Sequence, residues 1–450
     1  MFTNLFRVND VASIHMAARE FLNIAEAIGR RICAQAVWHE NRCNWMGMDP
    51  LERASTAFQP SATYRTLGPD LYSGTSGIAL FLAELFMESG DPLLRRTALA
   101  AMRHALSRVE TISPSARLGL FSGWFGIALV AARLAILLDE PDLQTDAQQL
   151  LQRASSEQFD MQEFDVMSGR AGAIAVLVVL NRIFDDGALI DFALRLGDEL
   201  VETADKEAIG YSWKSPGIRN HRNLTGFSHG VSGAAQALLE LHDATGISKY
   251  REAASLAFQY ENHWFDTKAA NWPDFRKDPS SPSGKKHNYP YMTFWCHGAP
   301  GIALSRIRAY ELTRDEQYRA DAIAALETTR ASIESALDTS TGNFSLCHGL
   351  AGNAEALLYG AEILNSASDE NAAAAFSVAK AGIERYAASN SSWPCGTHVG
   401  ETPNLMLGVA GIGHYYLRLY QPSIPSILIL GKDAWSNRAC KAAQRPRGTE

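Results

Sequence analysis

Two kinds of apolar run alternate along the chain. Runs such as 78–85 and 127–131 are apolar almost all round, whereas runs such as 92–110 and 370–386 carry charged residues on one face. A helix that is apolar on every side is buried on every side, and a helix with one charged face covers the outside of a fold. The pattern therefore predicts a two-layer helical protein, with inner helices in a ring and outer helices around them.

A Gly-x-x-Gly step precedes or begins each inner run. Seven copies occur, with last glycines 46 to 68 residues apart, which is enough chain for two helices and their connections. The copies are 74–77, 123–126, 169–172, 230–233, 298–301, 349–352 and 408–411. We expect the second glycine of each copy to open the inner helix. A repeat of this length predicts an array of helix pairs, in which equivalent positions occupy equivalent places in space.

The segments outside the repeats complete an all-α fold class. Residues 11–37 are predicted to form an amphipathic helix capped by Asn9 or Asp10, with one apolar stripe made of Phe21, Leu22, Ile24, Ile28 and Ile32. Only short pieces such as 424–430 resemble strands. We therefore expect an N-terminal helical segment at 1–69 packed on the repeats, one α-domain at 70–430, and a flexible tail at 431–450.

Two long polar insertions interrupt the repeats. They span 205–225 and 266–291 and come immediately before the fourth and fifth Gly-x-x-Gly copies. Loops of this length in compact domains are often lids or binding segments, although plain surface loops are common. Both interpretations stay open for these two segments.

The most apolar stretch, 118–138, has the length of a membrane span but contains Arg133 well inside it. An arginine near the middle of a lone span is costly. The same pattern recurs in the other repeats without flanking basic clusters, which favours a buried helix.

Charge and cysteine usage narrow the function classes. The net charge of −8 over 450 residues argues against a nucleic-acid partner, which requires a basic face. The N-terminus has no basic segment followed by an apolar core, so no signal peptide is predicted. Six cysteines are too few for a disulfide framework. A reducing cytoplasm is the expected location, and there a cysteine beside a histidine indicates metal binding or catalysis.

The polar residues just before three of the repeats are the candidate chemistry. Cys296 and Cys347 share one offset from the first glycine of consecutive copies, and His348 follows Cys347. Thiolate and imidazole are ligands that Zn²⁺ prefers, and three protein ligands leave one position open, as in catalytic sites. The alternative is two buried cysteines near helix starts. Cys33 is expected in the core, Cys395 is either a spare ligand or a loop residue, and Cys43 and Cys440 carry no signal.

A zinc ion with two thiolate ligands is suited to binding and activating a thiol, because an incoming thiol loses its proton on the metal and stays nucleophilic. His229, at the equivalent offset in the fourth copy, is a candidate general acid or base. Asp165, four residues before Gly169, could orient it. A lone buried aspartate is equally often a helix-start cap.

Several motifs resemble the lanthionine synthetase C-like (LanC) family over about residues 70 to 430. Within the sevenfold array, these are Gly-Phe-Ser-His-Gly at 226–230, Trp-Cys-His-Gly at 295–298 and Cys-His-Gly at 347–349. Flanking pieces resemble the cyclase domain of class II lanthipeptide synthetases: Asn-Trp-Met-Gly at 44–47, Trp-Pro-Asp-Phe-Arg at 272–276, and Cys395 with Glu-Thr-Pro-Asn-Leu-Met at 401–406.

The resemblance implies an α/α-toroid of seven repeated helix pairs and a zinc-dependent lanthipeptide cyclase. In such an enzyme a peptide cysteine adds to a dehydroalanine or dehydrobutyrine of the same peptide, closing a thioether ring. Carried over by motif, Cys296, Cys347 and His348 would bind Zn²⁺. His229 would protonate the enolate or deprotonate the thiol, with assistance from Asp165.

The chain departs from the family pattern before its first zinc cysteine. Some cyclases have an arginine four residues earlier, where this chain has Met292, and a tyrosine after that cysteine, where this chain has His297. We expect His297 to line the site as a second polar group. Stabilisation of the enolate is then left to His297 or Arg276.

The resemblance also implies partners. Class II enzymes fuse the cyclase to a large dehydratase, and the residues before the first repeat are too few for one. We therefore expect a dehydrated precursor peptide supplied by a separate dehydratase. Two alternatives stay open: addition of a small thiol such as glutathione to dehydroamino acids in proteins, and a non-catalytic, zinc-stabilised scaffold that binds peptides.

Overall fold

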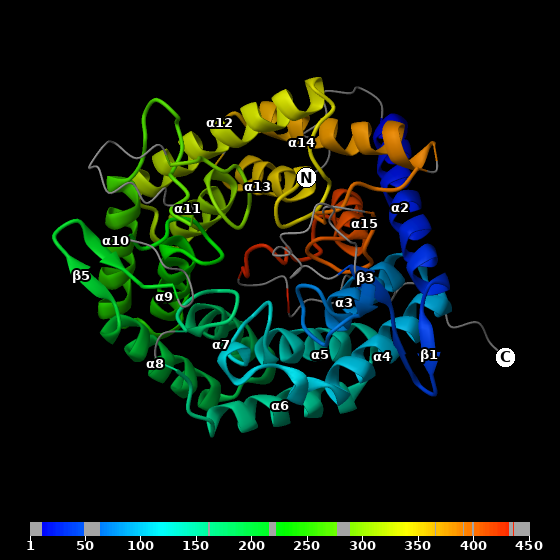
Figure 1. Ribbon diagram of the computed structural model, residues 1–450, viewed down its shortest axis with the longest axis horizontal. Coiled ribbons are helices and arrows are strands. Elements are labelled where there is room, and N and C mark those ends of the chain that lie inside the picture. Colours follow the sequence, from blue (N-terminus) through cyan, green and yellow to red (C-terminus); the bar gives the residue numbers. More distant parts are fainter. Residues whose placement is uncertain are drawn as a thin grey trace, which may run out of the picture.

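The computed structural model describes residues 11–48, 64–160, 163–215, 222–276, 289–364, 366–389, 391–397, 400–431 and 435, with side chains from residue 18 onward. Seen down the short axis, these residues form a ring of helices in two layers (Figure 1). The expected caps Asn9 and Asp10 and the cysteine Cys440 lie outside the described residues.

The inner layer consists of seven helices, one from each Gly-x-x-Gly copy. They are α3 (Thr75–Ser89), α5 (Trp124–Leu138), α7 (Arg170–Phe184), α9 (Val231–Thr245), α11 (Ala299–Thr313), α13 (Leu350–Ile363) and α15 (Val409–Tyr420). Each inner helix contacts the next one along the chain, and α15 contacts α3, so the ring is closed. This closure confirms the predicted α/α-toroid.

Each inner helix packs against one outer helix. The outer layer contains α4 (Pro92–Ser107), α6 (Pro141–Ser155), α8 (Gly187–Glu202), α10 (Ser248–His263), α12 (Glu316–Asp338) and α14 (Ser368–Gly382). The outer partner of α15 is α2 (Val11–Ala34), which comes from the opposite end of the chain. Phe21, Leu22, Ile28 and Ile32 of its predicted stripe are buried, and Ile24 is half-buried. The N-terminal helix thus completes the seventh helix pair.

The glycine pairs act differently from the prediction. Each inner helix begins directly after the first glycine, which is its N-cap in all seven copies, and the second glycine lies within the first turn. The carbonyl three residues before the first glycine folds back over that turn. A Cβ on the second glycine would lie only 1.8 to 2.3 Å from this carbonyl oxygen in every copy, as for Gly126 and Leu120. A side chain there is excluded because the preceding loop covers the helix start.

The apolar stretch 118–138 contains α5, which is buried inside the ring. Arg133 is 1% exposed, and its Nε lies 2.8 Å from Oε1 of Glu84 on α3. Its Nη1 donates to the carbonyl of Trp435 at 2.9 Å. A buried ion pair thus accounts for the charge in an apolar helix, as the buried-helix interpretation requires. Among the described residues, no helix combines the length and the apolar character needed to cross a bilayer.

Besides the helices of the ring, the fold contains short strands and short helical turns. Three antiparallel hairpins pair β1 (Val37–His39) with β2 (Arg42–Asn44), β3 (Met46–Met48) with β4 (Tyr64–Thr66), and β5 (Asp205–Glu207) with β6 (Gly210–Ser212). Short helical turns are η1 (Val109–Thr111), η2 (Pro114–Ala116) and η3 (Ile383–Ala387). The hairpins were missed because strands of three residues carry no alternation that could be recognised.

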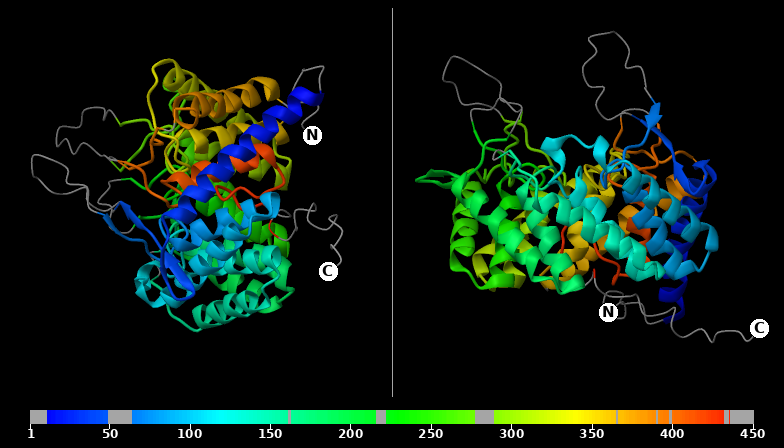
Figure 2. Two further views of the ribbon diagram at one scale, coloured as in Figure 1. Left: turned by 90° about the vertical axis from the view of Figure 1, so that its right-hand side faces the viewer. Right: turned by 90° about the horizontal axis from the view of Figure 1, so that it is seen from below.

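The expectation of a strand at 424–430 was wrong. This segment runs irregularly across the ring, and the carbonyl of Leu428 accepts a hydrogen bond of 2.9 Å from Nε1 of Trp295. It lies at the end of the ring opposite the β3–β4 hairpin (Figure 2). Of the predicted tail 431–450, the structure describes Gly431 and Trp435, and Trp435 is buried beside Arg133.

Candidate active site

A ring of backbone hydrogen bonds links the loops that precede the inner helices. At six of the seven junctions, the residue two positions before the first glycine of one repeat donates its backbone N–H. The acceptor is the carbonyl of the residue at the same position in a neighbouring repeat. The bonds run from Tyr72 to Phe121 (2.9 Å), Phe121 to Met167 (3.2 Å), Ser228 to Cys296 (3.2 Å), Cys296 to Cys347 (3.4 Å), Cys347 to Met406 (3.0 Å) and Met406 to Tyr72 (3.0 Å). At the remaining junction, Val166 donates to Ser228 at 3.2 Å. Equivalent positions therefore converge at one end of the toroid.

Cys296 and Cys347 are neighbours on this ring, and their thiols are hydrogen-bonded to each other. The bond from Cys347 lowers the pKa of the Cys296 thiol despite burial, and the charges of Arg276 and His229 lower it further. Burial and the Cys296 thiol raise the pKa of Cys347 well above its usual value. The side chain of Tyr72 also bonds to Cys347. Cys296 is thus the more acidic member of a thiol pair.

His348 lies next to this pair in the chain and is tied to the loop of the next repeat. Its Nε2 is 2.9 Å from the carbonyl oxygen of Gly396. A carbonyl only accepts, so Nε2 carries the proton and Nδ1 of the neutral ring keeps its lone pair. The Phe294 ring packs edge-on against the imidazole at 5.8 Å.

The donor chemistry of these three side chains fits a zinc ion. Two thiols are in contact, one of them is acidified, and the histidine proton is anchored on a backbone carbonyl, as is usual for metal-bound imidazole. Within the described ranges, no three histidine, cysteine, aspartate or glutamate side chains already converge at the spacing of a metal site. Zinc therefore stays a proposal, based on the donor types.

His229 and Asp165 form the second part of the site. His229 Nδ1 lies 2.5 Å from Asp165 Oδ2, although the residues belong to different repeats. Burial disfavours the protonated imidazole, but the charge and hydrogen bond of Asp165 outweigh it, so the pKa of His229 is raised. About a third of the His229 side chain (34%) is exposed, which leaves it accessible to a ligand.

Asp165 fulfils both roles that its position suggested. Its Oδ1 accepts a hydrogen bond of 2.7 Å from the backbone N–H of Ser168, which caps the turn before α7. The same turn is capped by Asp70 in the first repeat and by Asn404 in the seventh. At the corresponding place Asp70 Oδ2 accepts from the Ser73 hydroxyl and Asn404 Nδ2 donates to Thr402 Oγ1, whereas Asp165 Oδ2 accepts from His229 Nδ1. Of the three residues, Asp165 is therefore the one suited to orient a histidine.

His297 faces His229, with ring centroids 5.8 Å apart and ring planes 24° apart. It is 2% exposed, and burial together with the charge of Arg276 holds its pKa well below the usual value. Its Nε2 is buried and has no hydrogen-bond partner among the described residues. A neutral imidazole with an unsatisfied nitrogen beside His229 is well placed to hydrogen-bond a bound molecule.

Arg276 brings a positive charge to the thiols from the insertion after α10. Its Nη2 lies 2.7 Å from Oδ2 of Asp274, and the guanidinium charge favours the thiolate form of both Cys296 and Cys347. The loop is fixed by Thr225, whose hydroxyl donates to the carbonyl of Pro273 at 2.8 Å. At the position of Met292, the backbone carbonyl accepts from Asn271 Nδ2 at 3.1 Å.

The family model of the lanthionine synthetase C-like proteins matches residues 65–429. The chain belongs to this family. Its fold resembles the solved structure of nisin cyclase, with a TM-score of 0.59 and 18% identity over 78% of this chain and 89% of that one.

Three curated relatives of this LanC-like chain are about a quarter identical to it over the matched regions. The lacticin 481/lactococcin biosynthesis protein LcnDR2 of Lactococcus lactis subsp. lactis is 23% identical over 70% of this chain and 31% of its own. Glutathione S-transferase LANCL1 of Danio rerio is 23% identical, with coverages of 64% and 68%. The nisin biosynthesis protein NisC of the same Lactococcus is 24% identical, with coverages of 66% and 74%. The chain thus spans about a third of the length of LcnDR2.

The other described cysteines, Cys33, Cys43 and Cys395, are all buried. Cys33 is buried in α2, as expected, and Cys43 on β2 is buried close to it, where burial raises its pKa to about 12. Cys395 is buried too, and its thiol contacts the carbonyl of Thr402. Burial raises the pKa of Cys395 to about 11.

Three residues near the site were not among those predicted from the sequence. Tyr72 could have been found, because it occupies in the first repeat the offset of Cys296 and Cys347. Asp274 belongs to the quoted Trp-Pro-Asp-Phe-Arg motif, but nothing in the motif identified it as the partner of Arg276. Glu163 carried no signal. Burial, followed by the charges of Asp165 and Asp160, raises the pKa of Glu163 to about 7.

Proposed function

We propose that this protein is a zinc-dependent lanthipeptide cyclase, which forms (methyl)lanthionine thioether rings in a dehydrated precursor peptide. The observation that carries the proposal is the hydrogen-bonded thiol pair of Cys296 and Cys347, two neighbours on the ring, beside the His229–Asp165 pair. Family membership and the names of LcnDR2 and NisC support this choice of reaction.

Cys296, Cys347 and His348 would hold the ion. Zinc bound there would lower the pKa of an incoming peptide thiol and keep its sulfur nucleophilic. The polypeptide prepares these ligands in two ways. The charge of Arg276 favours the ionised thiols, and the Gly396 carbonyl fixes the proton of His348 on Nε2, so that Nδ1 is the available donor.

The proposed reaction is the addition of the S–H group of a thiol across the C=C bond of a dehydroamino acid. A new C–S bond forms at the β-carbon, the π electrons move to the α-carbon and its carbonyl as an enolate, and the α-carbon then takes up a proton. Asp165 holds His229 in position, and the raised pKa of His229 suits a proton donor near neutral pH. His229 would deliver this proton through Nε2, because Nδ1 faces Asp165.

Two further groups would stabilise the enolate. The Arg276 guanidinium supplies a fixed positive charge, and the unpartnered Nε2 of the neutral His297 supplies a hydrogen-bonding atom. We assign the electrostatic role mainly to Arg276, since the low pKa of His297 keeps that ring uncharged. A dehydratase would provide the dehydrated substrate.

A second enzymatic function is favoured by one relative. The name of LANCL1, a glutathione S-transferase, supports addition of a small thiol to a dehydroamino acid in a protein. Both reactions would use the same side chains and differ only in the source of the sulfur. A non-catalytic scaffold is less well supported, because it would give no role to the His229–Asp165 pair.

One experiment distinguishes these functions. The zinc-loaded protein is incubated with a dehydrated peptide that contains cysteine, with and without glutathione, and free thiols are then counted by alkylation and mass spectrometry. A cyclase makes the peptide thiols resistant to alkylation without a mass change. A glutathione-adding enzyme instead increases the mass by one glutathione per event. If neither product exceeds that of Cys347→Ala protein, both enzymatic proposals fail.

A further inference from the structure

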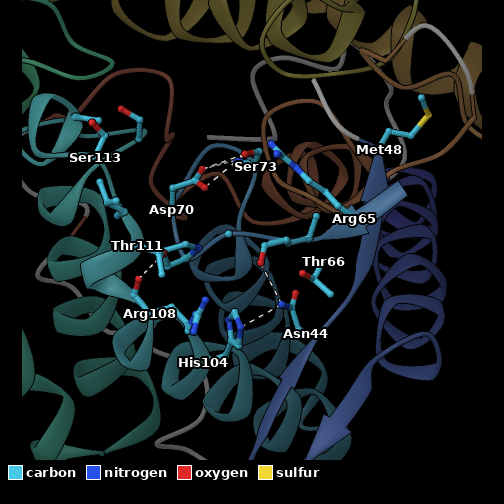
Figure 3. A pocket seen from close by; sticks show the side chains of 16 residues that line it. Asn44, Met48, Arg65, Thr66, Asp70, Ser73, His104, Arg108, Thr111 and Ser113 are labelled. Atoms are coloured by element: carbon cyan, nitrogen blue, oxygen red, sulfur yellow. Dashed lines mark hydrogen bonds between the residues drawn. The ribbon is translucent and has the colours of Figure 1, made fainter. Parts of the chain in front are cut away.

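A polar cavity of about 580 Å³ lies at the end of the toroid that carries the candidate active site, but between the first and second repeats. Its walls come from the β3–β4 hairpin, the loop before α3, the end of α4 and the loop before α5. Figure 3 shows Arg65 and Arg108 on different sides of the cavity, with Asp70 and Ser73 above and His104 and Asn44 below. None of these residues belongs to the site described above.

Two residues of the cavity wall occupy the repeat positions of the His229–Asp165 pair. Asp70 stands four residues before the first glycine of its repeat, as Asp165 does, and Ser122 has the offset of His229 in the next repeat. Both Asp70 and Ser122 line the cavity. Ser122, however, donates through Oγ to the carbonyl of Met167 at 2.8 Å, so this position lacks a proton-transfer group. This place in the ring can therefore bind a ligand, but the position equivalent to His229 has no side chain that transfers a proton.

The interior polar groups of the cavity are already satisfied. Asn44 Nδ2 lies 3.1 Å from His104 Nε2, and since an amide nitrogen only donates, His104 donates through Nδ1 to Thr75 Oγ1 at 3.0 Å. Asp70 Oδ1 accepts from the backbone N–H of Ser73 at 2.7 Å, and burial raises the pKa of its carboxyl group. Among the described residues that line the cavity, Asp70 is the only one with a carboxyl group, and this group is bonded within its own loop.

The other charged groups among the described lining residues are guanidinium groups. Arg108 at the end of α4 is exposed at the rim and forms no ion pair with any described residue, whereas Arg65 on β4 already interacts with another group. Besides burial, the charges of Arg108 and Arg42 lower the pKa of His104, so the cavity lies in a positive field. A cationic pocket in a chain with a net charge of −8 favours a carboxylate ligand.

We propose that this cavity binds an acidic side chain of the peptide substrate, at a distance in sequence from the residues that react. A peptide fits as the ligand because the cavity wall is bonded to the loop that carries Asp165: Ser122 donates to the carbonyl of Met167, two residues after Asp165. A peptide whose carboxylate is anchored at Arg108 would extend towards this loop. This inference rests on the proposed function for the nature of the substrate.

The test measures binding alone, with the full-length protein. Two fluorescein-labelled, N-acetylated hexapeptides are compared by anisotropy at low ionic strength, one with three glutamates and one with glutamines in their place. We expect the glutamate peptide to bind at least tenfold more tightly, and Arg108→Gln to remove most of this difference. Arg103→Gln is the matched control, since Arg103 is an exposed residue of α4 outside the cavity.

Each other outcome overturns the proposal. Equal binding of the two peptides, or an equal loss with Arg103→Gln, contradicts a carboxylate site in the cavity. Competition by inorganic phosphate that is as strong as competition by unlabelled peptide identifies a site for a free anion instead. Zinc content and thiol addition are measured on the same Arg108→Gln protein. Absence of cyclase activity in the wild type with retained peptide discrimination would reject the proposed function and leave the cavity assignment intact.

Discussion

Asp165 and His229 are joined by a hydrogen bond of 2.5 Å, although 64 residues separate them in the chain. The bond exists because the loops of consecutive repeats are linked edge to edge, with Val166 donating to the carbonyl of Ser228. The ring of backbone bonds therefore determines which side chains of different repeats meet. The same ring places Cys296 beside Cys347.

Asp165→Asn is expected to lower the pKa of His229. The substitution preserves an oxygen for the bond from Ser168 but removes the negative charge that raises the pKa, so burial, which lowers the pKa, then becomes the dominant influence on the imidazole. Histidine ring resonances followed by NMR against pH measure this shift. The resonances of His104, which lies in the other cavity, are the internal control. An unchanged His229 titration would contradict the role given to Asp165.

The same pair predicts a pH dependence of stability. Because the folded-state pKa of His229 is raised above its unfolded value of about 6.5, its contribution is full below that pH and is lost as pH rises through the folded-state pKa. The unfolding free energies of the wild type and Asp165→Asn should thus differ more at pH 6 than at pH 9. Urea unfolding at the two values checks this, and a larger difference at pH 9 would refute it.

Arg276→Met is expected to lower kcat for thioether formation roughly 100-fold when the variant is compared with the wild type at equal zinc content, because a charge that stabilises the enolate is lost. Arg276→Lys keeps the charge and should recover part of the rate. Steady-state kinetics on a dehydrated peptide give kcat and KM separately. A change confined to KM would indicate that Arg276 binds the peptide and leaves the enolate unaided.

Arg133→Met is expected to reduce the free energy of unfolding by about 3–5 kcal/mol, because Glu84 is left buried without its partner. The double variant Arg133→Met with Glu84→Leu should be more stable than the single one, since no unpaired charge remains. Chemical denaturation of the wild type, the two single variants and the double variant gives a double-mutant cycle. If the losses in unfolding free energy of the two single variants add up in the double variant, the two side chains are not coupled.

Gly126→Ala is expected to destabilise the protein by about 1–3 kcal/mol, because the new Cβ would lie 1.8 Å from the carbonyl oxygen of Leu120. Gly187→Ala is the control. A Cβ at Gly187, the first residue of α8, meets no atom within 4 Å. Thermal unfolding of the two variants compares them directly, and equal melting temperatures would contradict the explanation given for the second glycine of each repeat.

The repeat pattern was sufficient to predict the fold. Equal offsets from Gly298 and Gly349 predicted that Cys296 and Cys347 meet, because a repeat places equal offsets at equal places around a closed ring. The role of the N-terminal helix as the partner of α15 could not be predicted in detail, since it depends on where the ring closes. The predicted start of each inner helix was wrong by a few residues, because the sequence does not distinguish the N-cap glycine from the glycine that is buried in the first turn.

Some parts of the site lie outside the repeated motif, so their positions could not be predicted from equal offsets to the repeat glycines. Arg276 reaches the thiols from an insertion, so its position depends on contacts such as the bond from Thr225 to Pro273, which involve no repeated motif. The cavity near Arg108 combines a hairpin, a helix end and two loops. Its members lie at unrelated positions in the chain, although Asn44 was part of a motif quoted for another reason.

X-ray absorption at the zinc edge tests the central claim most directly. The zinc-loaded protein should give two sulfur ligands at about 2.3 Å, one imidazole and one light, exchangeable ligand. Addition of a peptide that contains cysteine should convert this to three sulfur ligands, and Cys347→Ala should lose one. A metal coordinated by four protein side chains, or a sulfur count that does not change when the peptide is added, would contradict activation of a thiol at Cys296, Cys347 and His348.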